Sequence, residues 1–518
     1  MTSTNSNIKQ KIKTKKRFWK WWHKWIGLVF AFFVIMFCLS GIILNHRNLF
    51  KSFDVPRYLL PKGYQIKNYN NGAIKGTLPL TKDSLLCYGA FGCFATDNGF
   101  NNFSDCNNGF DKGVDNRKIS RIIKDNYGNI IAVAQKDAFV FDTINRLWNK
   151  IPLESNNEKL VDVVFCEDTL IILSRSYIYQ AIYPYKEFTR IELKVSNEYK
   201  KEVSLFKTMW NLHSGELFGS AGKIVVDILG IILIILSLGG IIHFFLPYNI
   251  KRSKVKGNNT QKRVKFLGFN LKWHKRIGVY SIVLTMSLAI TGMCLRPPLM
   301  IPLILNSTPP IKYTILDNKN PFADKLRAIR KDKQTNEWII STSEGFYKVG
   351  NYNTDSVTKI NSNINISPMG INVFEQNSDG SWLIGSFSGM LVWNIQSDKI
   401  IDYFTCKPYK KIHGRPVGKN MISGISYDIN NSPVIFTYDK GALSSLPANP
   451  TMLSKQPMSL WNFALEVHTG RIYSVLIGKA SDLFIFFAGV IVALILISGY
   501  IINRKSKYKQ LKHIENTK

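Results

Sequence analysis

The sequence has few acidic residues and lacks the common motifs of nucleotide and hydrolase sites. Only 35 of its 518 residues are Asp or Glu, against 68 Lys or Arg, so the net charge is +33. We find no G-x-G-x-x-G after a predicted strand, no Walker A loop, no G-x-S-x-G and no H-E-x-x-H. Nicotinamide, nucleotide, esterase and zinc-protease functions therefore lack their usual motifs. Hydrophobic residues make up 45% of the chain, which excludes general disorder.

Four windows contain no Asp, Glu, Lys or Arg at all. They are the runs 25–45, 228–250, 277–295 and 483–503, composed mostly of Leu, Ile, Val, Phe and Ala. About 20 such residues span the roughly 30 Å hydrocarbon core of a bilayer as a helix, and only helices or closed barrels satisfy their backbone there. The sequence therefore predicts a membrane protein with four transmembrane α-helices.

The basic residues are concentrated between these runs and at the two ends. Residues 1–24 contain eight Lys or Arg and no acid, residues 248–276 contain ten and no acid, and residues 503–518 contain six with one Glu. The positive-inside rule then places both termini and the middle loop in the cytoplasm and the two long segments outside. Because the excess charge belongs to topology signals and attracts anionic lipid, we expect the lipid bilayer as a partner and no nucleic acid.

The chain contains an internal repeat. Trp22–Gly27 recurs as Trp273–Gly278, and the helices that follow end alike in Ser-Gly and Thr-Gly. His213-Ser214-Gly215 recurs as His468-Thr469-Gly470, and Asp227 recurs as Asp482. Each half contains two helices, so both halves have the same orientation, and we expect two parallel repeats about an axis along the membrane normal.

Both external segments alternate short apolar runs with Asn, Asp, Gly and Ser, which predicts strand–turn–strand units. The fold class is thus four transmembrane helices in two parallel repeats with two large β-rich external domains, either propeller-like or a generic sandwich. The predicted order is a basic N-terminus (1–24), helix (25–46), β-rich domain (47–212), His-Ser-Gly segment and helix (213–247), basic loop (248–276), helix (277–296), β-rich domain (297–467), His-Thr-Gly segment and helix (468–503) and basic tail (504–518).

The seven cysteines indicate little. Five lie in the external segments, where a disulfide is allowed. Cys87, Cys93 and Cys106 are close enough in sequence for a local disulfide, and their spacing matches no zinc or c-type haem motif.

Six of the eight histidines lie at predicted helix boundaries. His23, His243 and His274 lie at the cytoplasmic ends, and His46, His213 and His468 at or just beyond the external ends. Such residues are either interfacial or ligands, and a b-type haem needs two imidazoles about 4 Å apart through its iron. His23 and His46 are about 34 Å apart along one helix, so they do not share an iron. We therefore expect each haem to be held by histidines of one layer and different helices.

The W-H-K-x-I-G openings and the L-H-S-G and V-H-T-G segments resemble the PepSY-associated transmembrane helix family. This family includes inner-membrane ferric-siderophore reductases that carry haem and move electrons outward. The resemblance covers the four helices and their flanks, and it implies that His23, His274, His213 and His468 are the motif histidines. It also implies one or two haem b groups and a location in the bacterial inner membrane. At the repeat position of His46, this sequence has Pro297.

The leading hypothesis is a haem b electron-transfer protein, a candidate membrane oxidoreductase. It would take electrons from an unidentified cytoplasmic-side donor and reduce an external acceptor such as ferric iron in a siderophore. One alternative is a haem-free, membrane-anchored binding or regulatory protein that acts through its external β domains. Another is a transporter, favoured only by the parallel repeat. Whether a homodimer completes the bundle is left open.

Overall fold

The chain folds into two compact units. The computed structural model describes residues 2–156, 158–197, 199–365, 367, 370–410 and 418–503, so the predicted basic tail lies outside the described residues. One unit, the helical unit, comprises Met1–Arg47, Glu202–Asp317 and Asn462–Lys518. The other, the β-rich unit, comprises Asn48–Lys201 and Asn318–Trp461.

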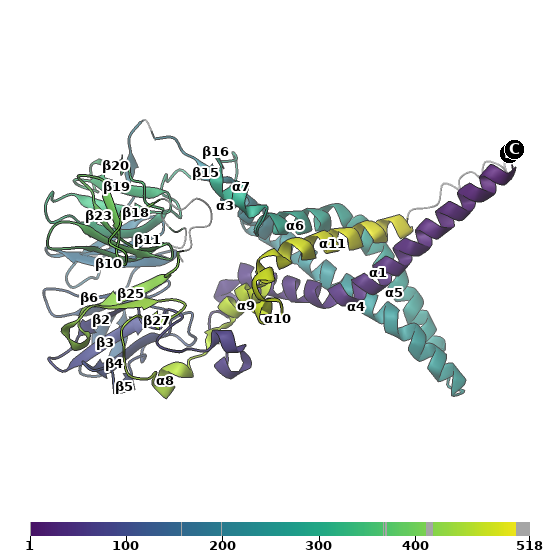
Figure 1. The fold of residues 1–518 in the computed structure, drawn as a ribbon, viewed down its shortest axis with the longest axis horizontal. Coiled ribbons are helices and arrows are strands. Elements are labelled where there is room, and N and C mark those ends of the chain that lie inside the picture. Colours follow the sequence, from purple (N-terminus) through teal and green to yellow (C-terminus); the bar gives the residue numbers. More distant parts are fainter. Residues whose placement is uncertain are drawn as a thin grey trace. The chain divides into compact units, whose positions relative to one another are not determined.

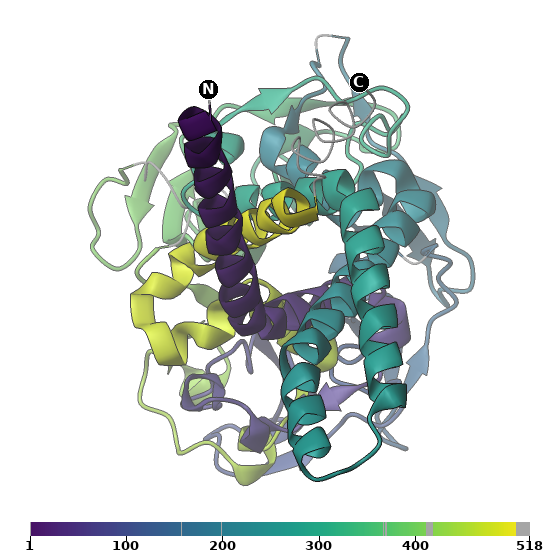
Figure 2. The same cartoon turned by 90° about the vertical axis from the view of Figure 1, so that its right-hand side faces the viewer.

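Long apolar helices dominate the helical unit. The longest are α1 (Thr2–Asn45), α4 (Gly219–Val255), α5 (Gln261–Tyr280), α6 (Ile282–Cys294) and α11 (Ser481–Asn503). Within the described residues, the segments 16–45, 216–255 and 481–503 are each long and apolar enough to cross a membrane. α1 packs against α4 and α11, α11 also packs against α6, and α5 packs against α4 (Figures 1 and 2).

The third predicted helix, 277–296, is wrong in its bounds and shape. The apolar run is divided between α5 and α6, which meet at Ser281 with a bend of 65° and count as a fourth span only when taken together. The Ser281 hydroxyl donates to the Ile277 carbonyl (2.8 Å), and the Thr285 hydroxyl donates to the Ser281 carbonyl (3.0 Å). Hydroxyl groups that bond back to the preceding turn make a bend easier, so the chain can bend at this position.

Short helices precede α4 and α11 and contain the two motif histidines. His213 lies on α3 (Leu205–Ser214), and His468 ends α9 (Leu460–His468). The glycine of each motif, Gly215 with φ 78° and Gly470 with φ 76°, adopts the left-handed conformation that stops the short helix and lets the chain turn.

The remaining short helices are α2 (Arg47–Phe50), α7 (Met300–Leu305), α8 (Thr451–Ser454) and α10 (Ser474–Ile477). The 3-10 turns are η1 (Arg57–Leu59), η2 (Lys62–Tyr64), η3 (Glu216–Phe218), η4 (Ile429–Asn431), η5 (Arg471–Tyr473) and η6 (Gly478–Ala480).

Six antiparallel sheets follow one another along the β-rich unit. They are formed by β2 (Gly76–Pro79), β3 (Ser84–Gly89), β4 (Gly92–Asp97) and β5 (Phe103–Asp105); β6 (Arg121–Lys124), β7 (Ile130–Val133), β8 (Ala138–Asp142) and β9 (Leu147–Lys150); β10 (Leu160–Cys166), β11 (Thr169–Ser174), β12 (Ile178–Ile182) and β13 (Thr189–Ile191); β17 (Leu326–Lys331), β18 (Trp338–Thr342), β19 (Gly345–Val349) and β20 (Ser356–Ile360); β21 (Ile371–Gln376), β22 (Trp382–Ser386), β23 (Gly389–Asn394) and β24 (Lys399–Asp402); and β25 (Ile422–Ser426), β26 (Val434–Thr437) and β27 (Gly441–Ala442). Two-stranded pairs join β1 (Asp54–Val55) to β28 (Met458–Ser459) and β15 (Val203–Ser204) to β16 (Ser307–Thr308).

The two segments that the sequence treats as separate β-rich domains form one unit. The first strand of each sheet contacts the first strand of the next, in the order β2, β6, β10, β17, β21 and β25, and β25 returns to β2. A short strand of the first segment, β14 (Lys194–Val195), also pairs in parallel with β20 of the second. The prediction of two domains is therefore wrong, because neither segment supplies enough sheets to close the ring alone.

Apolar side chains between neighbouring sheets form the core of the β-rich unit. One cluster includes Phe346, Phe374, Trp382 and Trp393, all at most 2% exposed. The cysteine cluster contributes to this core: Cys87, Cys93 and Cys106 are buried, and all seven cysteines are free thiols. Burial raises the pKa of Cys106, which keeps that thiol protonated at neutral pH. The local disulfide that the spacing allowed is not formed.

Candidate functional site

Two of the predicted histidines meet between α1 and α5. The ring centroids of His23 and His274 are 6.1 Å apart. Two imidazoles bound to opposite faces of one iron have nitrogens about 4 Å apart and ring centroids roughly 6 Å apart. This pair therefore has the spacing of two axial ligands.

A second pair forms between the two short helices. The ring centroids of His213 on α3 and His468 on α9 are 5.9 Å apart. α1 lies beside both pairs, because His23 is part of this helix and Ser40 of the same helix contacts His468. The 17 residues between His23 and Ser40 correspond to about 25 Å along the helix. The two pairs thus lie at two levels, separated by most of the thickness of a hydrocarbon core.

Each pair joins residues that are equivalent in the internal repeat. His23 corresponds to His274, and His213 corresponds to His468. A pair of equivalent residues in contact lies on the axis that relates the two repeats. Both candidate sites therefore lie on this axis, and each needs one side chain from each half of the chain.

Serine and threonine hydroxyls fix the orientation of three of the four imidazoles. The Nδ1 atom of His468 lies 3.1 Å from Ser40 Oγ, that of His213 lies 3.0 Å from Thr291 Oγ1, and that of His23 lies 2.9 Å from Ser498 Oγ. Each hydroxyl donates its own proton to a main-chain carbonyl one turn back, so it accepts from the imidazole Nδ1–H. This tautomer leaves Nε2 unprotonated, as a metal-binding imidazole requires.

Each of these hydroxyls is followed by a glycine that lies against the imidazole ring. A Cβ atom on Gly41 would lie 3.2 Å from Cε1 of His468, and one on Gly292 would lie 3.0 Å from Cε1 of His213. On Gly499 it would lie 3.1 Å from Cε1 of His23. The glycines therefore leave room for the rings, and the contact always crosses from one repeat to the other.

The fourth imidazole has the glycine but not the hydroxyl. His274 faces Gly239 and Gly240 of α4, where a Cβ on Gly239 would lie 3.3 Å from its Nδ1. Within the described part of the chain, this buried Nδ1 has no hydroxyl partner. The two sites thus differ: both histidines of the His213–His468 pair have a hydroxyl partner, but only one histidine of the His23–His274 pair does.

The other two predicted ligands are placed elsewhere. His46 Nε2 lies 2.6 Å from an Asp227 carboxylate oxygen, and the Asn45 amide donates to the other oxygen at 3.3 Å. The second repeat has an equivalent contact, in which the Arg296 guanidinium donates to Asp482 at 3.2 Å. His46 and Asp227 therefore form an inter-helix contact. His243 lies on α4 with an exposed side chain.

The Ser498-Gly499 and Gly239-Gly240 pairs were not identified from the sequence. The available signal was the repetition of a small dipeptide in the second half of the apolar helix that follows each His-Ser/Thr-Gly motif. Equivalent residues are 255 positions apart at the His-Ser/Thr-Gly motifs but 259 positions apart at these dipeptides. A comparison of the two repeats at one fixed spacing therefore does not match them. The extra four residues add about one helical turn between Asp482 and Ser498, compared with the stretch from Asp227 to Gly239.

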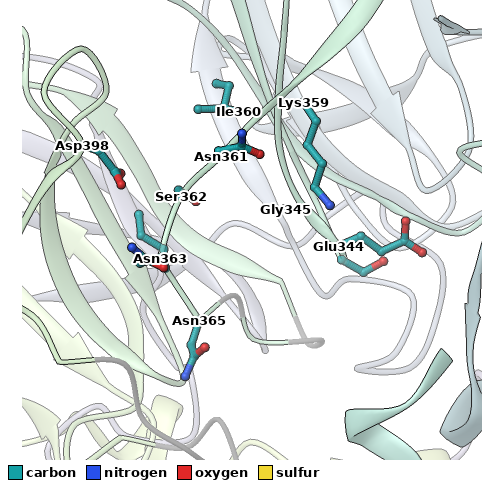
Figure 3. Close-up of a pocket in the computed structure, with 11 residues that line it drawn as sticks. Glu344, Gly345, Lys359, Ile360, Asn361, Ser362, Asn363, Asn365 and Asp398 are labelled. Atoms are coloured by element: carbon teal, nitrogen blue, oxygen red, sulfur yellow. The ribbon is translucent and has the colours of Figure 1, made fainter. Parts of the chain in front are cut away.

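The β-rich unit also contains a polar surface pocket of about 430 Å³. Its lining comprises Ser343–Gly345, Lys359–Asn365 and Asp398, and the amide side chains of one segment follow each other along its wall (Figure 3). The lining includes no histidine or cysteine.

Comparisons with known proteins identify the family. The model of the PepSY-associated TM region matches residues 3–246 and, again, residues 177–505. No curated protein matches the chain. Among solved structures, the extracellular domain of a hybrid two-component system from B. thetaiotaomicron is similar over 72% of this chain and 39% of that chain, with 9% identity and a TM-score of 0.34. A second such domain from the same organism matches over 75% and 38%, with the same identity and TM-score. The chain therefore covers less than half the length of these structures.

The two matches to the family model together include every long helix and all four paired histidines. With its long apolar helices, the protein is a membrane protein that belongs to the family of the PepSY-associated TM region.

Proposed function

We propose that the protein binds two haem b groups and transfers electrons across the membrane to an external acceptor. The observation that carries this proposal is the presence of two histidine pairs at two levels, each with the spacing of axial ligands. Family resemblance adds ferric iron in a siderophore as the acceptor class. The proposed location is the bacterial inner membrane, with both termini cytoplasmic, as the basic segments favour.

The residues present fit a haem better than a lone metal ion. Within the described residues, no group of three or more His, Cys, Asp or Glu side chains is arranged to hold a metal. Two imidazoles are enough only where a porphyrin supplies the remaining donors, and haem iron so held supplies a reversible one-electron couple. His23 and His274 would bind one haem, and His213 and His468 the other. The hydroxyls of Ser40, Thr291 and Ser498 would orient their imidazoles.

Optical spectra test this proposal. The detergent-purified protein from haem-replete cells should show a Soret band that sharpens, with a narrow α band, when dithionite reduces the air-oxidised sample. This is the spectrum of low-spin iron with two histidine ligands. A colourless protein would contradict the proposal and favour the haem-free binding or regulatory alternative.

Replacement of His46 with glutamine separates the roles of the boundary histidines. Because His46 Nε2 already contacts Asp227, the variant should retain the full Soret absorbance per protein and the same α band. The lost contact is partly exposed, so we expect a decrease of at most about 1 kcal/mol in the free energy of unfolding. Absorbance and a thermal melt in the same detergent measure both effects. Loss of a haem from this variant would instead make His46 an iron ligand.

The β-rich unit is proposed to be a propeller with six blades. This is supported by the succession of antiparallel sheets and by the ring that their first strands form. Such a domain would supply the external surface on which an acceptor binds.

A further inference from the structure

A second cavity lies where the six sheets of the β-rich unit meet. It has a volume of about 390 Å³ and is lined by the first strands of all six sheets. This volume is within the range of small-molecule sites, which is roughly 300–1,000 Å³. Five basic side chains and three acidic ones line it: Lys75, Arg121, Lys124, Arg327, Arg330, Asp162, Glu375 and Asp428.

All three acidic side chains already have partners inside the protein. Asp162 accepts from Arg330 Nη1 at 2.5 Å and from the Ile329 main-chain N–H at 3.0 Å. Asp428 accepts from the Thr77 hydroxyl, and Glu375 is hydrogen-bonded to Tyr427. Arg330 is the only lining cation paired with a lining carboxylate by a hydrogen bond among the described residues.

Four basic side chains of the lining, Lys75, Arg121, Lys124 and Arg327, have no carboxylate hydrogen-bonded to them among the described residues, and Lys124 is the exposed one of the four. Lys75 and Arg121 make no side-chain hydrogen bond with the described residues, and Arg327 donates only to the carbonyls of Asp324 and Leu326. Arg327 is only 9% exposed, and its buried Nε atom has no hydrogen-bond partner among the described residues. Burial lowers the pKa of Arg327 to about 10 and, with the charge of Lys118, the pKa of Lys75 to about 8. Both side chains are therefore cationic at neutral pH, at a cost in desolvation that a bound anion would offset.

The backbone directs these groups to the cavity. The register of β17 against β18 shifts between Leu326 and Ala328, so Arg327 occupies a β-bulge, a feature that re-aims a side chain. Lys75 precedes β2, and a Cβ on Gly424 would lie 2.0 Å from the Lys75 carbonyl oxygen. The glycine therefore permits the close approach of the first and last sheets that brings Lys75 to the ring.

We propose that this cavity binds a small multivalent oxyanion, either a polycarboxylate or a phosphate. Lys75, Arg121 and Arg327 are the binding cations. Guanidinium groups bind carboxylate and phosphate oxygens through paired hydrogen bonds, and an ammonium adds a point charge. Asp162 attracts the charge of Arg121 but is itself hydrogen-bonded to Arg330, and the five basic side chains of the lining outnumber the three acidic ones. This site is independent of haem and of the histidine pairs.

Titration calorimetry tests the site with the full-length protein in detergent at about 0.15 M salt, where weak surface attraction is screened. Citrate and inorganic phosphate are titrated separately into the wild type and into Lys75→Gln, Arg121→Gln and Lys82→Gln. Lys82 is exposed and does not line the cavity, so its variant is a control with the same change in charge. Arg327 is retained in all variants because it caps two carbonyls.

We expect one saturable site for at least one anion, with affinity reduced about tenfold or more in Lys75→Gln and in Arg121→Gln, and unchanged in Lys82→Gln. Preference for citrate would identify carboxylates as the ligand groups, and preference for phosphate would identify phosphates. The two cavity variants are separate tests of the site. If a thermal melt shows that one of them is unfolded, the other still tests the proposal. No saturable binding of either anion, or equal binding by the folded variants and the control, would overturn the proposal.

Discussion

Replacement of His213 and His468 together with alanine should remove about half of the haem bound per protein. The two side chains form one pair on the repeat axis, with ring centroids 5.9 Å apart, and no other histidine of the described residues is paired with either. The His23–His274 pair lies about 25 Å away along α1, so its haem should remain. The reciprocal variant, with His23 and His274 replaced, should lose the other half.

The measurement is the haem content per protein together with a redox titration of the α band. Wild-type protein should titrate in two one-electron steps, and each double variant should retain one of them. The two steps should differ in potential, because only one histidine of the His23–His274 pair has a hydroxyl partner on Nδ1, and hydrogen bonding to the ligand tunes haem iron. A matched control is His243→Ala, which should retain both steps. Retention of both haems in either double variant would exclude the paired residues as ligands.

Replacement of Gly292 with valine should lower the haem affinity of the His213–His468 site, although the substitution removes no ligand atom. A Cβ at this position would lie only 3.0 Å from Cε1 of His213 and 3.6 Å from both ring nitrogens, so the valine side chain fits only if the imidazole is displaced. It also disturbs the neighbouring Thr291 contact. Loss of such supporting contacts typically costs roughly 10–100-fold in metal affinity.

Gly268→Val is the control for this substitution. Gly268 is an exposed helical residue of α5, and a Cβ there meets nothing within 4 Å, so the same change in helix propensity occurs without a steric effect. We expect Gly268→Val to retain full haem content and Gly292→Val to lose haem on dilution, with the step assigned to the His213–His468 pair reduced. Equal haem retention in the two variants would show that the glycine beside the imidazole is not needed for space.

Local patterns in the sequence were sufficient to predict the strand pairs and the repeat. Two apolar runs, Trp382–Gly385 and Met390–Trp393, are separated by a Gly-containing turn. The structure pairs them as β22 and β23. For the histidines the sequence predicted only that each site takes residues of one layer from different helices, and it left three candidates in each layer; the structure brings together the two that are equivalent in the repeat. Ring closure was beyond this reasoning, because it joins residues far apart in the chain, such as Lys75 and Ile425, whose main chains are hydrogen-bonded.

The bend at Ser281 illustrates a different limit. A serine within an apolar run is compatible with a straight helix, and its hydroxyl bonds back to the preceding turn in either case. Whether the helix bends there depends on the packing of α5 on α4 and of α6 on α11, which no local pattern specifies. Composition therefore predicted the apolar segment but not its shape.

The placement of both sites on the repeat axis has a consequence for how such a protein arises. A half-length chain with one copy of each motif would contain one histidine of each pair, and the hydroxyl and glycine beside that histidine would belong to another molecule. It would build both sites only as a homodimer with two identical halves. Fusion of the halves frees each copy to change alone, as Gly239-Gly240 opposite Ser498-Gly499 shows, and so allows the two ligands of one site to become inequivalent.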